Sequence, residues 1–365
     1  MSFANVPIAE TGRLGGGRVL AAVRGFAPNW FTATMGTGGL SLALHATPLA
    51  IPGREGAAEA LWALNIALFA IMSALYAAQW LLFPAEARRV FTHPVLSMFF
   101  GAIPMGLATI INGLIAYVPG AIPLAQPLWW LDVALSCATG LGVPYLMFTR
   151  HEHRLERMTA VWLIPIVAAE VAAASGALLA PHLDPARAYE VLLTGYVLWA
   201  FSVPLAMSVL AILFLRLALH DLPEREFGAS GWLALGPIGT GALGLVLLGG
   251  DAPTIFAANG LAGVGDVANG LGVIGGLILW GYGLWWLGLA LLKTGRYLSD
   301  GLPFNLGWWA FTFPLAVYTL GTFALARATG LGALAIFGDA LAAALAAMWA
   351  IVAFRTAAML AAKAL

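Results

Sequence analysis

Hydrophobic runs long enough to cross a membrane recur along the whole chain. A helix needs about 20 mostly apolar residues to span the hydrocarbon core, and ten segments meet that requirement. None of them alternates between apolar and polar residues throughout its length, which disfavours a β-barrel. The pattern therefore predicts an all-α polytopic membrane protein with ten transmembrane helices and short connections. The predicted spans are 28–46, 57–83, 93–117, 127–149, 159–180, 189–219, 228–250, 268–293, 302–326 and 331–355.

Basic residues fall almost entirely on one side of this predicted topology. Of the 17 Lys and Arg residues, 14 lie in the N-terminal segment, at the C-terminal end or after the even-numbered spans. Only Arg54, Arg187 and Arg327 lie on the other side. Because basic residues are retained in the cytoplasm, this asymmetry predicts that both termini are cytoplasmic. The predicted organisation is a cytoplasmic N-terminal tail (1–25), a transmembrane transporter domain (26–356) and a cytoplasmic C-terminal tail (357–365).

Prolines in the odd-numbered spans suggest an internal repeat. Pro104, Pro165, Pro237 and Pro314 are spaced about one helical hairpin apart. A proline removes one backbone hydrogen bond, and membrane helices tolerate this where the freed groups face protein or a cavity. Transport proteins are commonly built from such repeats. We therefore expect five helical hairpins around a central pore, with the odd-numbered helices inner and proline-kinked. The alternative is prolines scattered at ordinary frequency.

Composition supports a membrane location and limits the partners. The chain is 61% hydrophobic and 9% charged, with a mean hydropathy of +0.90. A soluble domain is usually about a quarter charged, so the lipid bilayer of the cell (inner) membrane is the expected environment. Basic and acidic residues balance, which leaves no net field to attract nucleic acid.

The first span carries an unusual set of small and hydroxyl residues. Thr34, Thr37, Ser41 and His45 follow a spacing of i, i+3, i+7 and i+11, which places them on one helix face, and Gly38 beside them leaves room. Hydroxyl groups can solvate a dehydrated ion without the cost of a buried charge. The same residues also allow helices to pack closely. A pore-lining role and a packing role are both open.

Few ionisable side chains lie inside the spans, and no Lys or Arg lies at the centre of one. A cation pathway normally shows inward-facing acidic rings, whereas an anion can be stabilised by helix N-termini, backbone N–H groups and hydroxyls. Anion passage therefore fits best, with His45 or His93 tuning a mouth. Glu170 is a candidate for proton coupling, and a carboxyl held neutral between helices is the alternative.

Two motifs that suggest other chemistry are set aside. In "HEHRLE" (151–156) the histidines are two residues apart and cannot share a helix face, which argues against a metal site. "GTGALG" (239–244) lies inside a predicted span with no strand before it, unlike a nucleotide-binding loop. No convincing nucleophile or metal cluster is present either, so we expect no cofactor and no enzymatic activity.

Two stretches carry a resemblance to a known family. "NWFTATMGTGGLSLAL" (29–44) and "WWAFTFPLAVYTLG" (308–321) resemble the tellurite-resistance/dicarboxylate transporter family. This family includes fungal malate permeases, yeast sulfite efflux pumps, the bacterial tellurite-resistance protein and plant slow anion channels. The resemblance extends over the whole chain.

The resemblance implies a homotrimer in which the odd-numbered helices line a pore through each protomer. It also implies that a phenylalanine beside the ninth-helix proline closes the pore. Phe313 matches that position, with Phe311 as the second candidate, although residues alone would suggest core packing for either. The expected function is transport of a small anion, a C4-dicarboxylate such as malate. The alternatives are a channel or exporter for chloride, nitrate, sulfite or tellurite, and a membrane scaffold or signalling protein, which the short loops disfavour.

Overall fold

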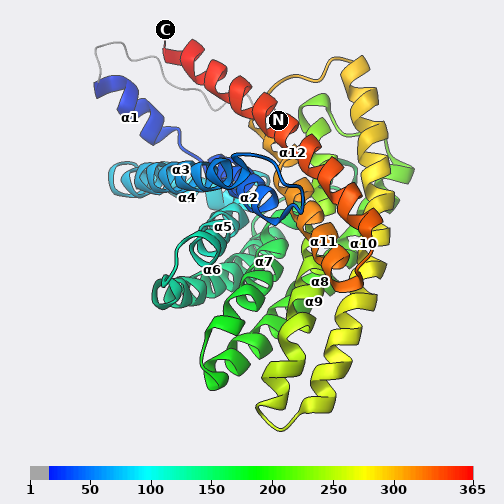
Figure 1. Cartoon of the computed structure of the whole chain (residues 1–365). Helices are drawn as coiled ribbons and strands as arrows, with labels where there is room; N and C mark the ends of the chain where they lie inside the picture. Colours follow the sequence, from blue (N-terminus) through cyan, green and yellow to red (C-terminus); the bar gives the residue numbers. More distant parts are fainter. Residues whose placement is uncertain (1–15, 365) are drawn as a thin grey trace.

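The computed structural model describes residues 16–364, and within that range the chain is helical with no β-strand. Figure 1 shows the helices arranged side by side around a common centre. The α-helices are α1 (Gly16–Arg24), α2 (Thr32–Ala46), α3 (Arg54–Leu82), α4 (Pro84–Arg89), α5 (Ala102–Tyr117), α6 (Ile122–Thr149), α7 (Ile164–Leu179), α8 (Pro185–Leu219), α9 (Leu235–Ala257), α10 (Ala262–Ser299), α11 (Phe313–Thr329) and α12 (Gly332–Ala364).

Helices α2, α5, α7, α9 and α11 form an inner ring. Each packs against the next, and α11 closes the ring against α2. In the spans that contain α5, α7, α9 and α11, 83–94% of the residues of the most apolar window are buried. The corresponding fractions for α3, α6, α8, α10 and α12 are only 11–33%. The odd-numbered helices of the predicted topology are therefore inner and the even-numbered ones outer, which confirms the arrangement of hairpins around a centre.

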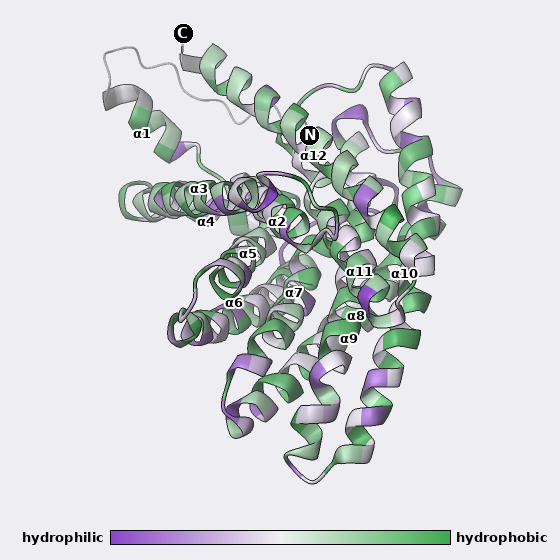
Figure 2. Ribbon diagram, in the orientation of Figure 1, coloured by the Kyte–Doolittle hydropathy of each residue, from purple (hydrophilic) through white to green (hydrophobic). Residues whose placement is uncertain are grey.

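The outer layer fits a lipid environment. Figure 2 shows mostly hydrophobic residues along the outer helices, whereas hydrophilic residues collect mainly near helix ends and loops. Nine helical segments in residues 16–364 are long and apolar enough to cross a membrane. The remaining predicted span corresponds to α2, which has only 15 residues and continues directly from a short 3₁₀ segment. The chain is a polytopic membrane protein, and ten crossings remain a prediction.

Each inner α-helix continues from a 3₁₀ segment. These segments are η1 (Pro28–Phe31), η3 (Leu96–Gly101), η5 (Ala160–Leu163), η7 (Arg225–Ala234) and η8 (Leu306–Phe311). Pro165 and Pro314 are the second residues of their α-helices, and Pro104 and Pro237 are the third. Proline is tolerated in the first turn because its missing N–H lacks an α-helical partner there. At the predicted kinks the structure thus shows a change from 3₁₀ to α-helix.

Helix α1 and the C-terminal end of α12 lie at the same face of the bundle. Figure 1 places α1 and the C-terminal end of α12 on one side, which we call the terminus face. Residues 1–15 of the predicted N-terminal tail lie outside the described residues, and α1 accounts for most of the rest. The predicted C-terminal tail (357–365) continues as helix α12 up to Ala364.

Candidate functional site

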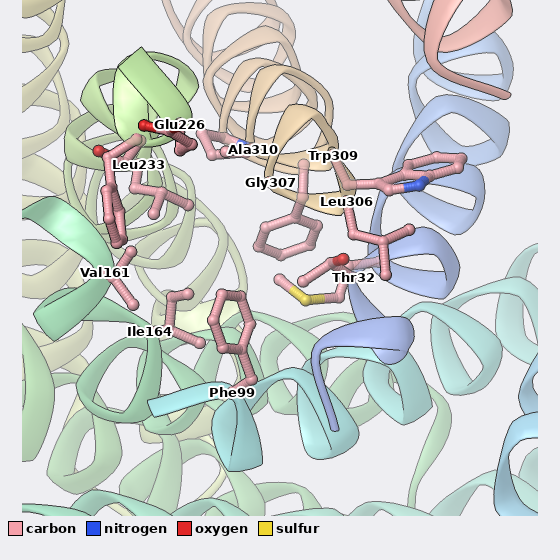
Figure 3. Close-up of a pocket in the computed structure, with 15 residues that line it drawn as sticks. Thr32, Phe99, Val161, Ile164, Glu226, Leu233, Leu306, Gly307, Trp309 and Ala310 are labelled. Carbon is pink, nitrogen blue, oxygen red and sulfur yellow. The ribbon is translucent and has the colours of Figure 1, made fainter. Parts of the chain in front are cut away.

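A small cavity of about 30 Å³ lies where the five inner helical segments meet (Figure 3). A buried water needs roughly 10–15 Å³ of such volume, so the cavity has room for about two water molecules. Its wall is mostly apolar. The lining residues are Thr32, Met35, Phe99, Val161, Ile164, Glu226, Phe227, Ser230, Leu233, Leu306, Gly307, Trp309, Ala310, Phe313 and Pro314.

The cavity lies at the N-terminal ends of the inner α-helices. Thr32, Ile164 and Phe313 are the first residues of α2, α7 and α11. Phe99 and Leu233 lie within three residues of the starts of α5 and α9. The backbone N–H groups at these junctions bond within the preceding 3₁₀ segments, as Thr32 does to Asn29 and Ile164 to Val161. The dipole of each helix still has its positive end on the cavity side. Five parallel helices therefore direct the positive ends of their dipoles toward one small space, which favours an anion.

Two hydroxyl groups are polar features of the cavity wall. The Thr32 hydroxyl donates a hydrogen bond to the carbonyl of Asn29 at 2.6 Å. The Ser230 side chain has no hydrogen bond to another described residue, although only 8% of Ser230 is exposed. The Ser230 hydroxyl is therefore available to donate to an ion in the cavity without adding a charge.

The two phenylalanines predicted as gate candidates occupy different places. Phe313 lines the cavity and is only 4% exposed. Phe311 is absent from the cavity wall and packs edge-to-face against Trp232 and Trp308, with ring centres 5.6 Å apart in both pairs. Geometry thus favours Phe313 over Phe311 as the gate, and the gating role itself stays a prediction.

A wide vestibule connects the cavity to the terminus face. The vestibule has a volume of about 1970 Å³ and shares Val161, Phe227 and Leu306 with the cavity wall. Charged side chains of both signs line it, so it is polar without being strongly basic. These side chains are Glu152, Arg154, Glu156, Arg157, Arg216, Asp221 and Glu224.

His93 lines this vestibule and organises its wall. Its Nδ1 atom accepts hydrogen bonds from the backbone N–H groups of Val95, at 3.2 Å, and Leu96, at 3.1 Å. These bonds require an unprotonated Nδ1, and burial lowers the pKa of His93 in the same direction. His93 is thus a neutral cap for η3 at the mouth of the conduit.

His45 lies at the opposite face and outside the cavity. Its Nδ1 is 2.9 Å from Glu55 Oε2, and its ring packs edge-to-face on Tyr117 with the centres 5.1 Å apart.

Within residues 16–364, no group of three or more His, Cys, Asp or Glu side chains is placed to hold a metal ion.

The hydroxyl stripe of the first span lies at helix–helix contacts. Ser41 donates a 2.7 Å hydrogen bond to the carbonyl of Ala58 in α3, and the Thr37 hydroxyl accepts one from Trp349 in α12. A side chain at Gly106 of α5 would meet the Thr34 hydroxyl at 2.3 Å. The contacts of these hydroxyls match the packing role, and they lend no support to a place in the anion pathway.

The face of α2 that borders the cavity is not the one that carries the hydroxyl stripe. Thr32 and Met35 line it, and a Cβ at Gly39 would lie 3.7 Å from the Phe313 ring. These positions are rotated from the predicted stripe by about a third of a turn or more. Gly38 follows the stripe, because a Cβ there would meet Thr109 and Asn65 at 2.2 and 2.6 Å. The contacts of these residues therefore favour the packing role over the pore-lining role, since small hydroxyl residues serve helix packing as well as ion contact.

Glu170 is fully buried in α7, and neither carboxylate oxygen has a hydrogen-bond partner among the described residues. The backbone carbonyl of Ile166, one turn earlier, accepts a hydrogen bond from the Ser202 hydroxyl of α8. A side chain at Gly195 of α8 would lie 3.5 Å from the carbonyl of Ala173, almost one turn later. Glu170 thus lies on the side of α7 that packs against α8, and proton coupling through it stays a prediction.

Comparison with known proteins agrees with an anion conduit. Residues 25–357 match the family model described as voltage-dependent anion channel, SLAC1. The chain is 40% identical to the sulfite efflux pump SSU1 of Arthroderma benhamiae over 82% of each chain. It is 29% identical to an uncharacterized transporter of Methanocaldococcus jannaschii, over 82% of this chain and 83% of the relative. It is also 23% identical to the malic acid transport protein of Schizosaccharomyces pombe, over 89% of this chain and 76% of that protein. Together with the ring of inner helices, these matches show that the chain belongs to the SLAC1 family of anion transporters and is not an enzyme.

Proposed function

We propose that this protein exports a small sulfur oxoanion, sulfite or bisulfite, across the cytoplasmic membrane. The observation that carries this proposal is the convergence of the N-terminal ends of five helices on one small cavity. The cavity wall includes two hydroxyl residues, one acidic residue (Glu226) and no Lys or Arg. Helix dipoles and hydroxyls replace part of the hydration that an anion loses. They do so without a fixed positive charge that would hold the ion too tightly to release it.

The placement of the vestibule supports export as the direction of transport. In this proposal the terminus face is cytoplasmic, as the excess of basic residues predicts. Helix α1 and the C-terminal end of α12 lie at this face. The vestibule opens at this face and narrows to the cavity. A wide inner mouth that collects the ion before a narrow passage suits export from the cytoplasm.

Size and similarity favour a sulfur oxoanion over a dicarboxylate. A cavity of about 30 Å³ needs only local widening to admit a compact inorganic anion, whereas a four-carbon diacid needs much more space. The relative named as a sulfite efflux pump is 40% identical, against 23% for the one named as a malic acid transporter. Malate is therefore the second candidate substrate.

In this proposal Phe313 closes the conduit. Its ring borders the cavity and lies within van der Waals distance of a Cβ placed at Gly39. Rotation of this one side chain would join the cavity to the space beyond it. We further infer that three protomers assemble, each with its own conduit, through the apolar surfaces of their outer helices.

A flux assay with purified protein tests the substrate. Proteoliposomes loaded with sulfite, malate or chloride would be diluted into anion-free buffer with and without a pH gradient, beside protein-free vesicles. We expect saturable sulfite efflux that exceeds malate efflux about tenfold or more, a difference of about 1.4 kcal/mol in the barrier. Preferential malate efflux would replace sulfite with the second candidate, and absence of any flux would reject both.

A further inference from the structure

Beyond the cavity, each inner α-helix has one partly exposed residue within an otherwise buried stretch. These side chains are partly exposed, while the residues immediately before and after them are buried. They are Leu42, Asn112, Leu178, Leu247 and Leu320. In α5, for example, Asn112 is the single partly exposed residue between positions 104 and 114.

This exposure faces the interior of the ring. In α11, Leu320 lies two turns beyond Phe313 at a spacing of i+7, on the helix face that borders the cavity. In α9, Leu247 lies 11 residues after Gly236, which places the two on the same helix face. Gly236 is three residues after Leu233, which lines the cavity. Gly236 is buried, yet a Cβ at this position would have no atom within 4 Å. Free space therefore adjoins the first turn of α9, on the helix face that also carries Leu247.

The other faces of α5 are occupied by neighbouring helices. The Thr109 hydroxyl accepts a 2.9 Å hydrogen bond from Asn65 of α3. Ile111 is fully buried in a hydrophobic cluster that also contains Trp129 of α6. Helices α2 and α7 also pack against α5, and Asn112 follows Thr109 by one turn. The partial exposure of Asn112 within this buried stretch matches that of Leu320 in α11, and we assign both to the lumen of the ring.

Asn112 is the single polar residue in this set of five lumen-facing side chains. Its Oδ1 atom is buried, and its amide has no hydrogen bond to another described residue. A polar group kept in an apolar setting without a partner costs free energy, which points to a functional reason. The amide nitrogen offers two N–H donors and no formal charge, which suits brief contact with an anion.

We propose that Asn112 is an anion-binding residue in the outer half of the conduit. It donates an N–H hydrogen bond to the oxoanion after the ion has passed Phe313, where four of the five lumen-facing side chains are leucines. This inference rests on the proposed function, and it adds a second polar contact to the one that Ser230 provides in the cavity. A neutral donor lowers the barrier for the anion without trapping it.

Two substitutions at this position test the contact. Asn112→Leu matches the four other lumen-facing residues and removes the donors, and it should lower sulfite efflux roughly tenfold. Asn112→Asp keeps the shape but places a carboxylate in the path. Its efflux relative to wild type should be lowest near pH 7.5 and should recover as the medium is acidified toward pH 4 and the carboxyl becomes neutral. Asn259→Asp, an exposed site after α9, is the matched charge control and should leave efflux unchanged.

Thiol labelling tests the position without relying on flux. In a Cys137→Ala background, which removes the one native cysteine, Asn112→Cys should react with a membrane-impermeant thiol reagent added from outside. The buried neighbour Ile111→Cys should not react. Wild-type efflux in both Asn112→Leu and Asn112→Asp, or no labelling of Asn112→Cys, would overturn the inference. Labelling without any sulfite efflux by the wild type would instead reject the proposed function and leave the lumen position established.

Discussion

The indole Nε1 of Trp349 in α12 donates a 3.0 Å hydrogen bond to the hydroxyl oxygen of Thr37 in α2. That hydroxyl in turn donates to the carbonyl of Ala33, 2.8 Å away within α2. The contact joins residues 312 positions apart in the sequence. A hydroxyl that sequence alone suggests for ion contact thus ties an inner helix to an outer one.

Thr37→Val should destabilise the protein and leave transport unchanged. The substitution removes the acceptor for the Trp349 N–H, which should lower the free energy of unfolding by about 1–3 kcal/mol. Thermal unfolding in detergent and sulfite efflux per folded molecule measure the two effects. Trp349→Phe should cost a similar amount, and the double variant should cost less than the sum of the two. Impaired efflux at wild-type stability would place Thr37 in the pathway instead.

Phe313→Ala should raise anion efflux roughly tenfold, which corresponds to about 1.4 kcal/mol of barrier. The ring borders the narrow cavity, so its removal opens the passage. Phe311→Ala is the control, because this ring packs between Trp232 and Trp308 outside the cavity wall. It should lower the free energy of unfolding by about 3–5 kcal/mol without raising efflux. Equal efflux in the Phe313 variant and the wild type would remove Phe313 from the gate.

Ser230→Ala should lower sulfite efflux about three- to tenfold, because a hydroxyl with no other partner is lost from the cavity wall. Stability should hardly change, since no hydrogen bond to a described residue is broken. Ser208→Ala removes a hydroxyl from the outer helix α8, where it donates to the carbonyl of Pro204, and should leave efflux at the wild-type level. Initial rates at several sulfite concentrations would separate a change in affinity from one in maximal rate.

Gly38→Ala and Gly236→Ala should differ in their effect on stability. A Cβ at Gly38 would lie 2.2 Å from the Thr109 hydroxyl, so Gly38→Ala should destabilise the contact between α2 and α5 by about 1–3 kcal/mol. A Cβ at Gly236 has open space around it, so Gly236→Ala should fold normally. We infer that this space is continuous with the conduit, so the Gly236 variant should show reduced efflux. Melting temperature and efflux of both variants check the pair, and a destabilised Gly236 variant would contradict the expected free space.

Protonation of His93 should lower the free energy of unfolding at acidic pH. Burial lowers the pKa of His93 in the folded state, so the unfolded chain binds a proton more readily. The contribution of neutral His93 to the free energy of unfolding is fully present above the unfolded pKa of about 6.5. It declines as the pH falls below that value, until His93 is protonated in the folded protein as well. His93→Asn, whose side chain can still cap η3, should reduce the loss of melting temperature between pH 7.5 and pH 5. An unchanged loss would show that other groups cause it.

The helices and their order along the chain could be predicted from the amino-acid sequence. Hydrocarbon admits only long apolar segments with satisfied backbones, so the runs at 159–180 and 189–219 could be read directly. The structure has η5, α7 and a further 3₁₀ segment, η6 (Ala180–His182), over 160–182, and α8 from Pro185 to Leu219. Proline spacing also predicted which helices are inner, and the motif at 308–321 singled out Phe313, which lies at the cavity.

The helix face that borders the conduit could not be predicted from the sequence and depends on how the helices pack. Thr37 and Met35 are two residues apart in α2, yet the first contacts α12 and the second lines the cavity. Asn112 carries no distinguishing pattern in the sequence, because its neighbours on all sides are apolar or small. The physical reason is that inner helices are buried all round. Their sequence therefore lacks the polar and apolar faces that orient a surface helix, and packing alone assigns each side chain to a neighbouring helix or to the lumen.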